Sequence, residues 1–131
     1  DVKLEGEDLS VITYGLMLHH CIEAARDLAE EGTSVEVVDL RTLRPLDEKT
    51  VIESVKKTGK ALIVHEDTRA LGVGAEVAAV VSEQAFEYLD GPVTRLAGPE
   101  VPAMPFSPPL EAVFMPSIDR VADAMRDLVR Y

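Results

Sequence analysis

Residues 35–47 constrain the fold more than any other part of the sequence. They predict a buried strand that runs directly into a fixed turn and a new helix. The strand carries β-branched and aliphatic side chains typical of a strand covered on both faces, namely Val35, Val37, Val38 and Leu40. Pro45 fixes its own φ and disfavours a helical conformation at Arg44. Asp47 then stands where it can cap the following helix, so the pattern indicates an α/β domain.

Arg41 and Arg44 follow this strand at its carboxyl end, where open α/β sheets usually form their sites. Both are therefore candidate functional residues. The interpretation that we favour is structural: the two guanidinium groups hold the loop by donating to carbonyl or carboxylate oxygens.

Composition narrows the range of partners. The 131 residues are enough for one domain with one core. Lys+Arg 13 against Asp+Glu 24 gives a net charge of −11, which repels phosphate backbones, so we expect no nucleic-acid partner. A basic protein partner is favoured, and its binding should weaken with salt.

The one cysteine, Cys21, excludes an internal disulfide and a Cys-rich metal site. No apolar run approaches the ~20 residues of a membrane span and nothing resembles a signal peptide, so we expect an intracellular protein.

Hydrophobic periodicity predicts strands and helices in alternation. Strands are expected at residues 2–5, 9–14, 61–65 and 93–97, with residues 66–73 as a loop. Helices are expected after Gly15, between Asp47 and Gly59, and over 75–89. The predicted inner stripe of that third helix consists of Ala75, Ala78, Ala79, Ser82, Ala85, Phe86 and Leu89. The alternation predicts a single domain over residues 1–131, with a mostly parallel sheet covered on both faces.

Residues 98–117 form a distinct, proline-rich segment. Its six prolines disfavour both helix and central strand, while its Met, Phe and Leu residues are unlike a disordered linker. We therefore expect an extended arm that lies on a surface of this domain or of a partner. Ser117 is then the predicted N-cap of a C-terminal helix at 118–130.

Two short motifs could carry chemistry. Gly72-Val73-Gly74-Ala75-Glu76-Val77 precedes a helix as a phosphate-binding loop does, but the third small residue of a dinucleotide fingerprint is missing. A tight loop and a close-packed helix start explain it better. His65-Glu66-Asp67, at a strand end, could act as acid and base or hold a metal. The alternative that we favour is a polar strand end whose His65 is bonded to the backbone. His19 and His20 are adjacent on a helix and so do not form a two-His metal site.

Three segments in order carry a family resemblance: residues 39–47 (Asp-Leu-Arg-Thr-Leu-Arg-Pro-Leu-Asp), the stretch from Val64-His65-Glu66-Asp67 to Ala78, and residues 97–105 (Ala-Gly-Pro-Glu-Val-Pro-Ala-Met-Pro). They resemble the C-terminal domain of the beta subunit of 2-oxo acid dehydrogenase complexes, in the transketolase C-terminal domain family. The arm is more similar to the branched-chain type than to the pyruvate type. The resemblance implies a three-layer α/β/α fold with a five-stranded sheet in the order 1-3-2-4-5, the first strand being antiparallel.

The resemblance also implies a reaction for the intact enzyme. That enzyme uses thiamine diphosphate and Mg²⁺ to decarboxylate a 2-oxo acid, and passes the acyl group to a lipoyl arm. The family's diphosphate motif lies in the alpha subunit and needs Asn, which this sequence lacks. The family's catalytic His lies in the preceding domain and is not His65. We therefore expect this chain to hold no catalytic, cofactor-binding or metal-binding residue and to be inert alone.

The partners implied by the resemblance are the alpha subunit, a second beta subunit and the peripheral-subunit-binding domain of the dihydrolipoyl acyltransferase; a homodimer of this chain is also compatible with it. In the family, that basic domain is held by an acidic residue before the last strand and by the terminal carboxylate, which here match Asp90 and Tyr131. The alternative for Asp90 is a turn with Gly91 and Pro92. The expected location is the bacterial cytoplasm, or the mitochondrial matrix in a eukaryote.

Other functions remain open at this point. One is a small self-sufficient enzyme that uses His65, Glu66 and Asp67 with Arg41 or Arg44. Others are the beta subunit of a pyruvate dehydrogenase, the C-terminal domain of transketolase or deoxyxylulose-phosphate synthase, and a purely structural dimerisation domain.

Overall fold

A computed structural model describes all residues from Asp1 to Tyr131. Its strands are β1 (Val2–Leu4), β2 (Leu9–Thr13), β3 (Val35–Asp39), β4 (Ala61–Thr68) and β5 (Thr94–Gly98). They form one sheet in the order β1-β3-β2-β4-β5. Strand β1 is antiparallel to β3 and the other pairs are parallel. The predicted sheet order and the antiparallel first strand are confirmed.

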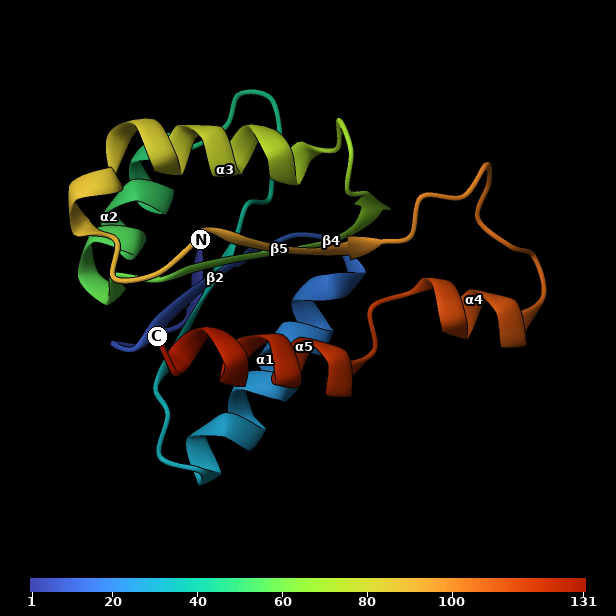
Figure 1. Ribbon diagram of the computed structural model, residues 1–131, viewed down its shortest axis with the longest axis horizontal. Coiled ribbons are helices and arrows are strands. Elements are labelled where there is room, and N and C mark those ends of the chain that lie inside the picture. Colours follow the sequence, from blue (N-terminus) through green and yellow to red (C-terminus); the bar gives the residue numbers. More distant parts are fainter.

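Helices cover both faces of this sheet, as Figure 1 shows edge-on. They are α1 (Leu16–Glu30), α2 (Glu48–Thr58), α3 (Val73–Gln84), α4 (Pro108–Phe114) and α5 (Ile118–Val129), with a 3₁₀ turn η1 (Phe86–Tyr88) after α3. Helices α1 and α5 pack on one face and α2 and α3 on the other, each pair over its own aliphatic cluster. The predicted three-layer α/β/α fold is confirmed.

The ends of α2 and α5 follow the predicted signals. The Asp47 carboxylate accepts a hydrogen bond from the Thr50 N–H at 3.1 Å, and the Ser117 hydroxyl accepts one from the Arg120 N–H at 3.2 Å. Gly59 ends α2 with φ +72°. These caps explain why both helices begin, and why α2 ends, where the sequence predicts.

The buried face of α3 differs in part from the predicted stripe: Ala85 is buried as predicted, and Ala78 and Leu89 pack against the same cluster. Its buried residues are Gly74, Val77, Val80 and Val81, while Ser82 and Phe86 are exposed. The helix also ends at Gln84, and β4 runs on to Thr68 within the predicted loop. The error has a physical cause: in an alanine-rich helix the larger valines gain more by burial, so they decide which face turns inward.

The proline-rich segment is only partly extended. Residues 108–114 form α4, which lies with its flanking chain away from the sheet (Figure 1). The prediction of a wholly extended arm at 98–117 was wrong for this part, because Pro108 and Pro109 occupy the first turn, where a missing N–H costs nothing. The end of α4 returns to the body through Phe114, which is 9% exposed and lies against Gly98.

An ion pair that the sequence analysis missed lies inside β3. The Glu36 side chain is only 2% exposed, and Lys57 from α2 donates to its carboxylate. Burial raises the pKa of Glu36, but hydrogen bonds from Lys57 and from the Gly6 backbone outweigh burial and leave its pKa below the ordinary value. The pair therefore ties α2 to the centre of the β2–β3 half of the sheet.

Candidate docking site

His65, at the carboxyl half of β4, is fully buried, and neither of its ring nitrogens has a hydrogen-bond partner. The predicted bond from His65 to the backbone is not made with hydrogen-bond geometry, although the Asp67 backbone lies close enough to the ring to affect its pKa. Its ring stacks on Tyr14 with the centroids 6.4 Å apart. Burial lowers the pKa of His65, while the carboxylate of Asp67 opposes this effect. A neutral imidazole can remain unpaired at lower cost than an imidazolium, so the buried position favours an uncharged ring.

The glycines of the 72–77 loop permit this burial. A Cβ atom at Gly74 would collide with Nε2 of His65, and one at Gly72 would collide with the Thr68 carbonyl oxygen. Gly74 also lies in the first turn of α3. The prediction of a tight loop and a close-packed helix start is confirmed.

The other candidate histidines and carboxylates do not converge. Glu66 and Asp67 are exposed, whereas His65 beside them is buried. His20 bonds the Pro116 carbonyl oxygen at 2.9 Å, and His19 is exposed. No group of three or more His, Cys, Asp or Glu side chains in the structure could hold a metal ion. The geometry therefore gives no support to a small self-sufficient enzyme built on His65, Glu66 and Asp67.

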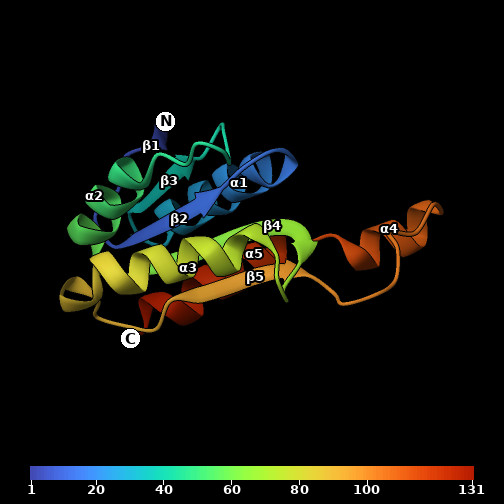
Figure 2. The ribbon, with the colours of Figure 1, turned by 90° about the horizontal axis from the view of Figure 1, so that it is seen from above.

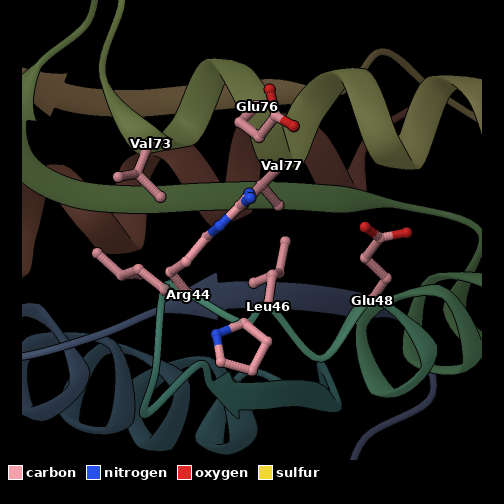
Figure 3. Close-up of a pocket in the computed structure, with 8 residues that line it drawn as sticks. Arg44, Leu46, Glu48, Val73, Glu76 and Val77 are labelled. Carbon is pink, nitrogen blue, oxygen red and sulfur yellow. The ribbon is translucent and has the colours of Figure 1, made fainter.

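The two arginines after β3 have different surroundings. Arg41, with φ +56°, donates to the Asp1 carboxylate at 3.2 Å, which agrees with a loop-holding role. Arg44 makes no such bond. Its side chain extends across a hollow of about 470 Å³ between the 43–48 segment and α3, as Figure 3 shows. Glu48 and Glu76 also line this hollow, whereas Arg41 and His65 do not, so the structure does not bring the arginines and His65 into one site.

Asp90, by contrast, has a defined position. It follows η1, its N–H donates to the Gly59 carbonyl oxygen at 2.7 Å, and its side chain is exposed. The carboxylate lies directly over Gly59 at the C-terminus of α2, where a Cβ atom would collide with Asp90 Oδ2. Asp90 therefore lies in a bend of the chain with Gly91, as the alternative predicts, and also exposes its carboxylate to solvent.

Tyr131 lies next to the same turn. Its N–H donates to the Leu128 carbonyl oxygen at 3.3 Å after α5, and its side chain is 73% exposed. A Cβ atom at Gly91 would lie 3.2 Å from Tyr131 Cβ. Two residues far apart in the sequence, Asp90 and Tyr131, are thus brought to one end of the molecule, where Figures 1 and 2 both place the chain end beside the turn after α3.

Comparison with known proteins identifies the class to which this fold belongs. The family model described as "Transketolase, C-terminal domain" matches residues 1–121, and the chain belongs to that family. Among curated relatives, the 2-oxoisovalerate dehydrogenase subunit beta of Bacillus subtilis (strain 168) is 50% identical over 131 residues, which is 100% of this chain and 40% of the relative. The pyruvate dehydrogenase beta subunit of the same organism is 44% identical over 131 residues, with the same coverage of both chains.

A solved structure supports the same family. It is described as a split gene transketolase, inactive beta4 tetramer, and matches with a TM-score of 0.84 and 28% identity over 99% of this chain and 41% of that chain. The chain thus spans about 40% of the length of the first curated relatives. Mitochondrial pyruvate dehydrogenase beta subunits from Dictyostelium discoideum and Arabidopsis thaliana also match. None of the helices has the length and apolar character needed to cross a membrane.

Proposed function

We propose that this chain is part of the beta subunit of a branched-chain 2-oxo acid dehydrogenase. The observation that carries the proposal is the 50% identity to a 2-oxoisovalerate dehydrogenase beta subunit over the whole chain, against 44% for the pyruvate dehydrogenase counterpart. In the intact enzyme the reaction is the oxidative decarboxylation of a branched-chain 2-oxo acid, followed by acyl transfer to a lipoyl group. The location is the cytoplasm in a bacterium and the mitochondrial matrix in a eukaryote.

Within that enzyme, the role of this domain is assembly and docking rather than chemistry. Thiamine diphosphate and Mg²⁺ belong to the intact enzyme, and the residues of this chain do not fit a site for them. They offer no group of carboxylates, histidines and cysteines that could hold a metal ion, and the sequence has no Asn. We expect the chain alone to be inert and to contact the alpha subunit and a second beta subunit.

The docking partner is the peripheral-subunit-binding domain of the dihydrolipoyl acyltransferase, a basic module. Asp90 is the proposed charged contact, because charge-assisted hydrogen bonds to Arg or Lys are strong, and Tyr131 beside it is the second proposed contact. Two observations support this proposal. Tyr131 lies against Gly91, which directly follows Asp90 in the chain, and the net charge of −11 favours the approach of a basic partner.

Calorimetric titration tests the proposed enzyme type. The chain is titrated with the peripheral-subunit-binding domain of a branched-chain acyltransferase and, separately, with that of a pyruvate-type acyltransferase. We expect the branched-chain module to bind more tightly. Tighter binding of the pyruvate-type module would overturn the branched-chain assignment.

A further inference from the structure

Three of the six aromatic side chains lie exposed at the same end of the molecule. Phe86 is 73% exposed, Tyr88 49% and Tyr131 73%. Phe86 and Tyr88 belong to η1, the turn that precedes Asp90, and Tyr131 lies against Gly91. A chain with only 5% aromatic residues thus leaves half of them in water at one corner, which both views place at the end of the sheet opposite α4.

A hollow of about 700 Å³ lies between η1 and the segment that leads into β5. Its lining includes Phe86, Leu89, Pro92 and Val93, together with the carboxylate-bearing Glu87 and Asp90. No Lys or Arg lines it. Lys56 lies 4.8 Å from the centroid of the Tyr88 ring and does not line the hollow. The hollow therefore combines an apolar wall with a negative rim.

Phe86 is exposed because of the way in which α3 ends. The helix α3 turns its valines inward and ends at Gln84, and the η1 turn then directs Phe86 outward instead of along the buried stripe. Exposed aromatic residues beside a pocket are typical anchors of protein–protein interfaces. A charged rim around them orients the partner and raises its association rate.

We infer that Phe86 is the apolar anchor of the surface that receives the basic docking module, with Asp90 and Glu87 on its acidic rim. This inference rests on the proposed docking function and extends it from the contacts at Asp90 and Tyr131 to an aromatic anchor. The occupant is a small module that presents an apolar side chain flanked by Arg or Lys. Charge complementarity and the continuity of the hollow with Asp90 favour this occupant over a second copy of the equally acidic chain.

The test is a calorimetric titration of the branched-chain peripheral-subunit-binding domain into the 131-residue chain and its variants, each at low and at moderate salt. Phe86→Ala is expected to raise Kd roughly tenfold or more without changing the salt dependence, because the lost contact is apolar. Phe86→Leu should recover part of the affinity. Phe106→Ala is the matched control, since Phe106 is fully exposed on the segment before α4.

The outcomes separate the inference from the function on which it rests. If wild type binds and Asp90→Ala weakens binding while Phe86→Ala does not, the anchor is wrong and the docking function stands. Equal losses in Phe86→Ala and Phe106→Ala would also overturn the anchor. If wild type does not bind at either salt, both fail. Urea unfolding of each variant shows whether an altered Kd reflects lost contact or lost folding.

Discussion

The carboxylate of Asp90 lies over the α-carbon of Gly59, where a Cβ atom would collide with Asp90 Oδ2. The Asp90 N–H also donates to the Gly59 carbonyl oxygen at 2.7 Å. The end of α2 therefore holds the backbone of Asp90, and the glycine leaves the space in which its carboxylate lies. The glycine that ends α2 is thus in contact with the carboxylate that we propose binds a partner.

Gly59→Ala should lower both stability and docking. At φ +72° an alanine costs about 1–2 kcal/mol of unfolding free energy, and its methyl group displaces the Asp90 carboxylate. Urea denaturation and titration with the docking module measure the two effects. Gly32→Ala is the control, because Gly32 has φ +88° but open space around it, so it should cost stability alone. Equal affinity in the two variants would show that docking does not depend on the position of the Asp90 carboxylate.

Asp90→Ala should weaken docking by about 1–3 kcal/mol, the range for the loss of a charged hydrogen-bond partner. The salt dependence of Kd should decrease at the same time, because one ionic contact is removed. Titration at two salt concentrations gives both quantities. Asp67→Ala serves as the control, since Asp67 is an exposed carboxylate at the opposite end of β4. Unchanged affinity in Asp90→Ala would remove Asp90 from the site.

Lys57→Met should destabilise the fold by about 3 kcal/mol at pH 7, because it leaves the Glu36 carboxylate buried without its cation. In wild type the folded-state pKa of Glu36 is lowered, so its contribution to stability is present above about pH 4.3 and is lost as the pH falls below that value. In Lys57→Met the lowering by Lys57 is lost, and burial, the largest single effect, is expected to outweigh the remaining hydrogen bonds from Ser54 and Gly6 and to raise this pKa. The unfolding free energy of the variant should then increase as the pH falls from 7 to 5.

Urea unfolding at pH 7 and pH 5 shows whether the unfolding free energy of Lys57→Met increases as the pH falls. Lys49→Met is the control, because Lys49 is 82% exposed and its pair with Glu53 is a surface pair worth little. A variant Lys57→Met that is as stable as Lys49→Met, or that loses stability toward pH 5, would contradict the role assigned to the buried pair.

Cys21 should be unreactive while the chain is folded. Burial raises the pKa of its thiol to about 12, although a hydrogen bond with the Thr13 side chain opposes the shift. Because the thiolate is the reactive form, a thiol reagent at pH 8 should label the native chain far more slowly than the chain in urea. A Ser82→Cys substitution in a Cys21→Ser background supplies an exposed comparison on α3. Rapid labelling of native Cys21 would contradict its burial in the α1–α5 cluster.

Local signals in the sequence predicted most of the fold. Asp47, Gly59 and Ser117 act within a few residues of their own positions, so the ends of α2 and α5 could be predicted without tertiary information. The sheet order came from the family resemblance. The buried face of α3 could not be predicted in the same way, because alanine fits either face and packing against β4 decides between them.

The candidate site was predicted in part. Asp90 and Tyr131 came from the resemblance, and the structure brings them to one end of the molecule. Phe86 was missed because its spacing matches a helical stripe, and only the end of α3 at Gln84 turns it outward. The Glu36–Lys57 pair could have been predicted from the sequence. A single carboxylate within an apolar strand is stable when a cation pairs with it, and Lys57 lies in the next helix.

The affinity of the wild-type chain for the branched-chain peripheral-subunit-binding domain, measured by calorimetry over a series of salt concentrations, tests the central claim most directly. An acidic docking surface predicts measurable binding at low salt whose association constant falls steadily as salt is added. No binding at any salt concentration, or an affinity that does not respond to salt, would contradict it.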